Sequence, residues 1–213
     1  MTKMAGSGSR ALCMCALALA VFSVRSEEAT HDMSTMDPHA HHHHMMAQMN
    51  EVKKSTVTVR VTPIPLVRQD ASKTTLAREL SGNVPTIVAF IYTSCTTVCP
   101  VTSQILASTQ DALGAEISKV RILSISIDPE YDTPARLKDY AEKYGAKPQW
   151  QHFGGTLANS VEVQKAFGAF RGDKMNHVPQ FYINGGGKSE WVLLDGFPSA
   201  EELVKVLHEQ IRG

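Results

Sequence analysis

The pattern of hydrophobic and polar positions predicts several strands in the first part of the folded region. Residues 56–61 alternate polar and apolar side chains, as in a half-exposed strand, and residues 64–67 are expected to pair back as an edge strand. Residues 85–92 are almost continuously apolar and rich in β-branched and aromatic side chains, which indicates a central strand covered on both faces. Residues 121–127 predict a second strand of this kind.

Helices are predicted between and after these strands. An apolar stripe after Pro100 predicts a helix, formed by Val101, Ile105, Ala112 and Leu113. Thr133 is a candidate N-cap with Pro134 at the first helical position, and Gly145 is expected to end that helix. The rest of the pattern predicts a strand at 150–153, a helix at 157–167, a strand hairpin at 178–183 and 190–194, and a last helix that begins with a capping box at Ser199.

The order of these elements, together with two cysteines, indicates the fold class. Cys95 and Cys99 directly follow the first central strand. A cysteine pair at this place in an alternating order of strands and helices predicts an α/β fold, a thioredoxin-like sandwich with a mixed central sheet flanked by helices. The predicted domain spans residues 53–213, which is long enough to bury one sizeable core.

The first residues of the chain resemble a targeting segment. Lys3 and Arg10 precede an apolar run at residues 11–22, which is shorter than the roughly 20 residues that a bilayer span needs. Residues 1–26 are therefore predicted to be a signal peptide, with a membrane anchor that tethers the protein as the alternative. Either one predicts an exported protein, in the periplasm or at the outer face of the cytoplasmic membrane.

Residues 27–52 form a separate segment that is expected to be a disordered tail, because almost nothing in it can build a core. Six of the nine histidines and five of the nine methionines of the chain lie here. Imidazole suits Cu(II) and thioether sulfur suits Cu(I), so the tail predicts weak copper binding at several sites, with a plain linker or a tag as the alternative. The candidate auxiliary ligands are His31, Met33, Met36, His39, His41, His42, His43, His44, Met45, Met46 and Met49.

Cys95 and Cys99 are the candidate functional residues of the domain. Thiols four positions apart at the start of a helix lie on one face, within reach of one metal ion or of each other. Cu(I) accepts two or three soft ligands, and an imidazole would complete a trigonal set. Of the histidines in the domain, His177 precedes a strand expected beside the cysteine loop, while His152 and His208 are expected in the core or on the surface. The residues alone leave His177 open between a copper ligand and an ordinary loop histidine.

Three short motifs extend this interpretation. They are Cys95-Thr-Thr-Val-Cys99-Pro100, Ser126-Ile-Asp128-Pro129-Glu130-Tyr-Asp132-Thr133-Pro134 and Asn176-His177. Together they resemble the Sco/SenC proteins, copper chaperones of cytochrome c oxidase assembly, over about residues 56–211. The resemblance implies that Cys95, Cys99 and His177 are copper ligands and that Asp128 lies near the site, with local capping as the alternative role of Asp128. Many relatives have an acidic residue where this chain has Asn176.

The resemblance also implies a function. The chain is expected to be an exported copper metallochaperone that delivers copper, as Cu(I) or Cu(II), to the dinuclear copper site of cytochrome c oxidase during its assembly. Its partner would be the copper-bearing subunit of the oxidase or another copper acceptor. Such a protein is a binding and transfer protein more than an enzyme.

The alternative is a thiol-disulfide oxidoreductase that keeps partner cysteines reduced, with Cys95 or Cys99 as the attacking thiolate. Val178-Pro179 favours it, since thioredoxin-like folds commonly have a cis-proline at this place. The 21 basic and 21 acidic residues balance and form no basic stripe, so no nucleic-acid partner is expected.

Overall fold

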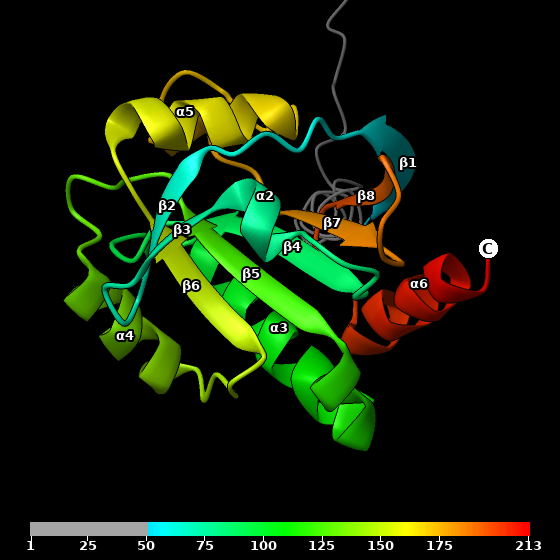
Figure 1. Cartoon of the computed structure of the whole chain (residues 1–213). Helices are drawn as coiled ribbons and strands as arrows, with labels where there is room; N and C mark the ends of the chain where they lie inside the picture. Colours follow the sequence, from blue (N-terminus) through cyan, green and yellow to red (C-terminus); the bar gives the residue numbers. More distant parts are fainter. Residues whose placement is uncertain (1–50) are drawn as a thin grey trace, which may run out of the picture. The chain divides into compact units, whose positions relative to one another are not determined.

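The computed structural model describes residues 51–213, in which helices surround one mixed sheet (Figure 1). The predicted signal segment (1–26) and nearly all of the predicted tail (27–52) lie outside these residues, and their boundaries remain predictions. Residues 51–213 hold an eight-stranded sheet and two hydrophobic cores of their own, which are the features of a domain that folds by itself. None of the helices in it is long and apolar enough to cross a membrane.

Within residues 51–213 the sheet has eight strands in the order β1-β8-β7-β4-β5-β6-β2-β3. The central strands β4, β5 and β6 run parallel, and the other neighbours pair antiparallel. The strands are β1 Lys53–Thr58, β2 Pro65–Arg68, β3 Lys73–Thr75, β4 Thr86–Ile91, β5 Arg121–Ser126, β6 Trp150–Gly154, β7 Gln180–Asn184 and β8 Glu190–Asp195.

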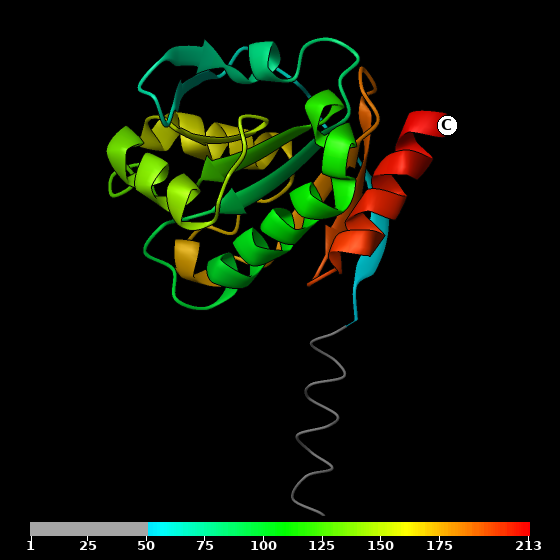
Figure 2. The same ribbon diagram turned by 90° about the horizontal axis from the view of Figure 1, so that it is seen from below.

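Helices connect and cover these strands. They are α2 Leu76–Glu79, α3 Val98–Leu113, α4 Pro134–Lys143, α5 Leu157–Ala166 and α6 Ala200–Arg212, with the 3₁₀ helices η2 Gly114–Lys119 and η3 Lys174–Asn176. The predicted caps are confirmed, because Thr133 accepts a hydrogen bond from the Arg136 amide and Ser199 accepts one from the Glu202 amide. Figure 2 shows α3 and α6 side by side along the sheet.

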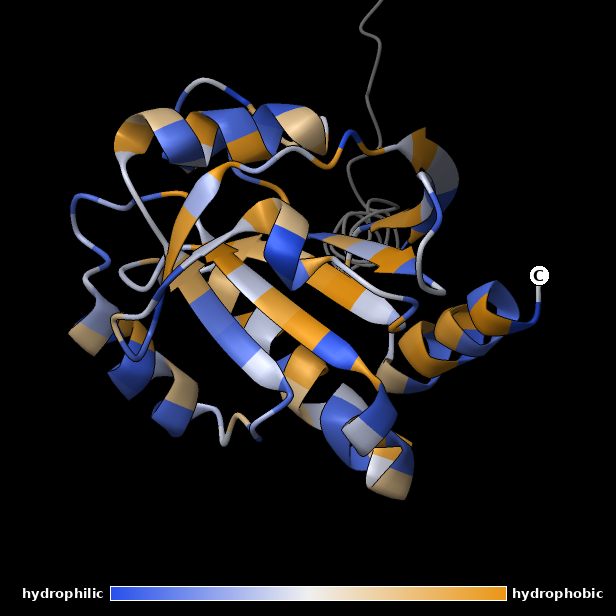
Figure 3. Cartoon of the chain, in the orientation of Figure 1, coloured by the Kyte–Doolittle hydropathy of each residue, from blue (hydrophilic) through white to orange (hydrophobic). Residues whose placement is uncertain are grey.

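Two cores lie on opposite faces of the central strands. All six residues of β4 are buried, as the sequence predicts, and residues 87–90 alternate between the cores. Ile87 and Ala89 pack with α3 and α6, whereas Val88 and Phe90 pack in the other core with Phe153 and residues of α4 and α5. Figure 3 shows the resulting concentration of hydrophobic residues along β4 and β5. The sheet is therefore covered on both faces and forms a rigid base for the loops at its edges.

The predicted pairing of residues 64–67 is wrong in one respect. These residues form β2, which pairs with β3 and β6 and not with the strand before it, and β3 is the edge strand. The physical reason is a tight turn at residues 69–72, where Ala71 has a φ of 66° and the Asp70 carboxylate accepts from the Ser72 amide at 2.9 Å. This turn returns the chain as β3, while β1 pairs along its whole length with β8.

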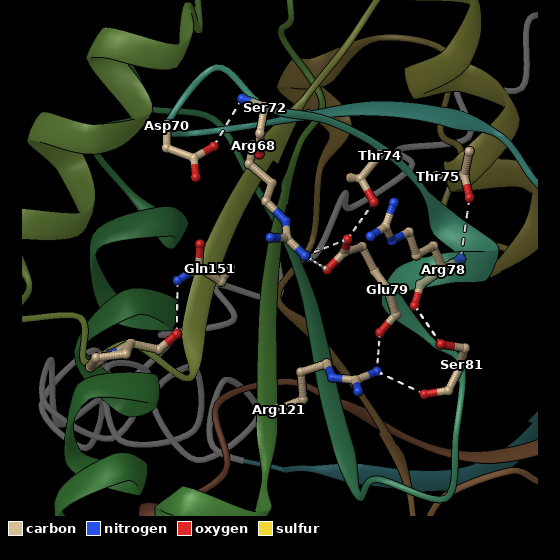
Figure 4. Close-up of polar contacts among 11 residues, drawn as sticks. Arg68, Asp70, Ser72, Thr74, Thr75, Arg78, Glu79, Ser81, Arg121 and Gln151 are labelled. Atoms are coloured by element: carbon tan, nitrogen blue, oxygen red, sulfur yellow. Dashed lines mark hydrogen bonds and ion pairs between the residues drawn. The ribbon is translucent and has the colours of Figure 1, made fainter.

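A buried ion pair holds this edge of the sheet, as Figure 4 shows. The Arg68 guanidinium donates to both carboxylate oxygens of Glu79, at 2.6 and 2.7 Å, and Glu79 is 5% exposed. Thr74 also donates to this carboxylate, and Arg121 donates to the backbone carbonyls of Glu79 and Ser81. The contacts join β2, β3, α2 and β5.

The predicted apolar stripe on the helix after Pro100 is wrong in part, because Leu113 and Ile105 pack against a core but Val101 and Ala112 are exposed. α3 begins earlier, at Val98, and Val101 is 45% exposed. Much of the buried face is polar: the Ser103 hydroxyl lies 2.9 Å from the Tyr140 hydroxyl, and the Gln110 amide donates to the Gly145 carbonyl at 2.8 Å. These residues face α4 and the turn that follows it, where hydrogen bonds replace apolar packing.

Candidate functional site

The two thiols come together where β4 meets α3. Cys95 lies in the turn after β4, where its amide donates to the Tyr92 carbonyl at 3.2 Å, and Cys99 lies in the first turn of α3. The Cys99 amide donates to Cys95 Sγ at 3.5 Å. Both cysteines are buried and neither forms a disulfide. The fold therefore places the predicted thiol pair in one short segment, as the spacing indicates.

The two thiols differ in their ionisation. Burial alone would raise the pKa of Cys95, but hydrogen bonds from the Cys99 and Thr97 amides and from the Thr97 hydroxyl outweigh it and lower the pKa to about 7. Burial raises the pKa of the Cys99 thiol far above its ordinary value, because this side chain is fully enclosed. Near neutral pH, about half of Cys95 is therefore thiolate, whereas Cys99 is a neutral thiol.

His177 lies at the end of η3, directly before β7. Its amide donates to the Lys174 carbonyl at 3.1 Å, and its ring stands edge-on to the Tyr92 ring with the centroids 6.5 Å apart. Burial lowers the pKa of His177, although the Phe90 carbonyl acts in the opposite direction. Its Nε2 atom is buried and has no hydrogen-bond partner among residues 51–213. A neutral imidazole with an unpartnered nitrogen is able to bind a soft metal ion.

Tyr92 contacts both the cysteine turn and His177. Sequence reasoning did not select this residue. Burial raises its pKa to about 12, together with a hydrogen bond to the Cys95 side chain. The Tyr92 hydroxyl also lies 3.8 Å from Met175 Sδ, and Lys174 Nζ lies 5.6 Å from the centre of the Tyr92 ring. The tyrosine thus joins the cysteine turn to the segment that carries His177.

Asp128 provides a second link between these segments. Its carboxylate accepts from Lys174 Nζ at 2.5 Å, and its backbone carbonyl accepts from the amides of Tyr131 and Asp132. Asp128 therefore both forms the local turn and lies beside the histidine segment. Asp132, which is fully buried, accepts from the Thr93 amide and from the Ser126 hydroxyl, and so fixes the start of the cysteine turn against β5.

Comparisons with known proteins show the family of this chain. The family model described as SCO1/SenC matches residues 52–212. The chain belongs to the SCO1/SenC family. It is 32% identical to the SCO1 protein homolog of Bacillus subtilis over 140 residues, which cover 62% of this chain and 72% of that relative.

Solved structures of the same family have a similar fold. The structure of Bradyrhizobium japonicum ScoI with copper bound is 26% identical, with a TM-score of 0.59, and the match covers 70% of this chain and 98% of that one. BsSco, described as having a disulfide switch and as a member of the Sco family of cytochrome c oxidase assembly proteins, is 24% identical with a TM-score of 0.61, and the match covers 76% of this chain and 98% of that one. The predicted thioredoxin-like α/β fold and the resemblance to Sco/SenC proteins are confirmed.

The other two histidines of the domain, His152 and His208, have partners of their own, as expected for core and surface residues. His152 is fully buried on β6 and hydrogen-bonded to Gln69 at 3.1 Å, and His208 on α6 lies 2.9 Å from the Glu116 carboxylate. Among residues 51–213 no three histidine, cysteine or acidic side chains are close enough together to hold a metal ion. His177 is thus next to the cysteine turn without being in a preformed three-ligand cluster, and its role as a ligand remains a prediction.

The expected cis-proline is wrong, because the residues that the structure describes contain no cis peptide bond. The chain is already extended at His177, and the Pro179 carbonyl accepts from the Gly196 amide at 3.0 Å. A trans proline at the beginning of a strand satisfies this pairing, since proline lacks an amide donor but keeps its carbonyl.

Proposed function

We propose that this SCO1/SenC protein is an exported copper metallochaperone that delivers copper to the dinuclear copper site of cytochrome c oxidase during its assembly. One observation carries the proposal. Cys95, which forms a thiolate, lies beside the Cys99 thiol, and the unpartnered Nε2 belongs to His177, whose ring packs against Tyr92 at the start of the cysteine turn. Two soft sulfurs and one imidazole are a donor set that fits copper. The copper-bound structure of ScoI supports the same assignment.

The chain's own groups would act on the cargo in different ways. Cys95 presents an anionic sulfur near neutral pH, whereas Cys99 must lose its proton to become a ligand. His177 is held neutral by burial, so its ring need not lose a proton first. The ligands belong to two separate loops, which permits them to be exchanged one at a time with an acceptor.

A thiol-disulfide oxidoreductase is the second candidate function, and the low pKa of Cys95 favours it. The Cys95 thiolate would attack one sulfur of a partner disulfide and form a mixed disulfide. Cys99 would then lose its proton and displace the second partner thiolate, leaving a Cys95–Cys99 disulfide and a reduced partner. Burial strongly disfavours ionisation of Cys99, and this makes the second step slow.

Copper loading of residues 51–213 under anaerobic conditions tests the binding site. We expect one bound copper, and we expect His177→Ala to weaken binding and change the coordination spectrum while the fold remains intact. His208→Ala is the matched control, because it removes a histidine that contacts Glu116 on the surface. An unchanged spectrum in His177→Ala would show that the histidine assignment is wrong.

Cells that lack the protein separate the two functions. Copper delivery predicts a loss of oxidase activity that added copper restores and that His177→Ala fails to complement. Full complementation by His177→Ala with none by Cys95→Ser would instead support the oxidoreductase.

The segments before the domain have proposed roles of their own. Residues 1–26 would export or tether the protein, and the histidines and methionines of residues 27–52 would bind additional copper weakly. Deletion of residues 27–50 should lower the total bound copper and leave one tight site. Unchanged stoichiometry after the deletion would mean that this segment is a plain linker.

A further inference from the structure

Met175 is the only methionine among residues 51–213, since the other eight methionines of the chain lie at or before residue 49. It is also 73% exposed, more than any other large hydrophobic side chain that the structure describes as exposed. Methionine normally fills gaps in hydrophobic cores. Neither core of this domain contains one, so core packing does not explain Met175.

The backbone around Met175 is firmly held. The Asp173 carboxylate accepts from the Met175 amide at 2.8 Å, and the Asp173 carbonyl accepts from the Asn176 amide at 3.0 Å. The preceding residue, Lys174, pairs with the buried Asp128 carboxylate at 2.5 Å. The 3₁₀ turn is therefore fixed on both sides, and an exposed thioether stands at a defined place.

That place is beside the candidate copper ligands. Met175 Sδ lies 3.8 Å from the Tyr92 hydroxyl, and the His177 ring packs edge-on against the same tyrosine. The Cys95 amide donates to the Tyr92 carbonyl at 3.2 Å, so the cysteine turn begins at this residue as well. A thioether and an imidazole thus contact the tyrosine from which the cysteine turn begins, and the thioether is more exposed than Cys95 or His177.

The chemistry of the group completes the argument. A thioether is a soft, neutral donor that prefers Cu(I) to harder ions. It has no proton to release, and it binds copper more weakly than a thiolate does, so it suits a ligand that must let go.

We propose that Met175 is a Cu(I) ligand beside the cysteine site, where its sulfur binds the ion in the loaded protein. This inference rests on the proposed copper-binding function and adds a fourth donor, from the chain itself, to the three residues named above. No change of copper oxidation state is involved, because the thioether binds Cu(I) without gaining or losing electrons.

The test uses the uniqueness of Met175. Residues 51–213, released from a tag so that no initiating methionine remains, are produced with selenomethionine, which places a single selenium atom at position 175. The protein is loaded with one equivalent of Cu(I) under anaerobic conditions. X-ray absorption at the selenium edge should then detect a copper neighbour at bonding distance.

A matched control places the thioether elsewhere. The double variant Met175→Leu, Ile211→Met keeps one selenium atom but moves it to α6, where Ile211 is 48% exposed. The end of α6 packs against Gly185, which follows β7 at the end of the sheet opposite to the cysteines. This control should bind copper through the cysteines and show no copper beside selenium.

The outcomes separate the two proposals. A domain that binds one copper with no copper neighbour at selenium, or with the same signal in the control, overturns the role of Met175 and leaves the cysteine site standing. A wild-type domain that binds no copper overturns the proposed function and the role of Met175 together. Because the labelled wild-type residue is itself the probe, the main result does not depend on how a substitution folds.

Discussion

The difference in ionisation between Cys95 and Cys99 leads to the sharpest prediction about the site. Cys95 with a pKa of about 7 is about half thiolate at pH 7, whereas an ordinary thiol with the reference value of 9.0 is about 1% thiolate. The lower pKa reduces intrinsic nucleophilicity by about tenfold. At equal access to the reagent, Cys95 should therefore react with iodoacetamide about fivefold faster than an ordinary cysteine. Cys99 should be almost inert, because it is both neutral and fully buried.

The assay measures each thiol alone. Cys99→Ser leaves Cys95 as the reactive group and should show a thiolate absorbance change, and a matching rise in alkylation rate, with a midpoint near pH 7. In residues 51–213, Cys95→Ser leaves only Cys99. This variant should show neither the absorbance change nor the rise in alkylation rate below about pH 10. If both variants titrate together near the ordinary value, the hydrogen bonds to Cys95 do not stabilise its thiolate and the reasoning is refuted.

One further variant tests the physical cause. The Thr97 hydroxyl lies 3.6 Å from Cys95 Sγ and is one of the groups that lower the pKa of Cys95. Thr97→Val, made together with Cys99→Ser, should raise the midpoint of the titration. Thr97→Ser keeps the hydroxyl and should leave it unchanged.

Two predictions concern stability. Glu79→Gln should lower the free energy of unfolding in urea by about 1–3 kcal/mol, since it removes the buried charge that pairs with the partly exposed Arg68. Glu142→Gln, in an exposed pair with Lys138, should change it by less than about 0.5 kcal/mol. Equal effects of the two substitutions would contradict the role of Glu79. Burial lowers the pKa of His152 to about 3, below its unfolded value of 6.5, so its contribution is present above pH 6.5 and is lost as the pH falls toward 3. In His152→Gln the decline of stability between pH 6 and pH 4 should be shallower by up to about 1.4 kcal/mol per pH unit, and identical slopes would exclude His152 as a source of acid sensitivity.

The central part of the fold could be predicted from the sequence because the continuously apolar residues there form strands that are buried on both faces. The apolar run that forms β4 is buried on both faces, and such runs are typical of central parallel strands. The partner of β2 could not be predicted, because it depends on the turn at residues 69–72 and on β6, about 80 positions further along the chain. The polar buried face of α3 was also missed, since Ser103 and Gln110 resemble surface residues until Tyr140 and the turn at Gly145 are placed against them.

The candidate site likewise has a part that could be predicted from local sequence and a part that depends on long-range contacts. The cysteine spacing is local, so the sequence predicts that the thiols lie together. Tyr92 and Met175 are 83 positions apart and Asp128 and Lys174 are 46 apart, and such contacts depend on the register of the sheet and not on any local pattern. A signal for Met175 did exist in the sequence, namely a single methionine in the domain, one residue before the Asn176-His177 motif.

The position of the site on the sheet gives a physical reason to prefer transfer of a metal to permanent binding of one. β4 lies between β5 and β7, and its register places the end of β4, the end of β5 and the start of β7 at the same end of the sheet. The cysteines, Asp128 and His177 lie in the segments that adjoin these strand ends. A structural metal site is usually closed by its ligands. Here the rigid strands fix where each loop begins, while a partly exposed ion pair and one tyrosine join the loops to each other. Ligands carried on such loops can separate without disturbing either core, which is what release of a bound ion to another protein requires.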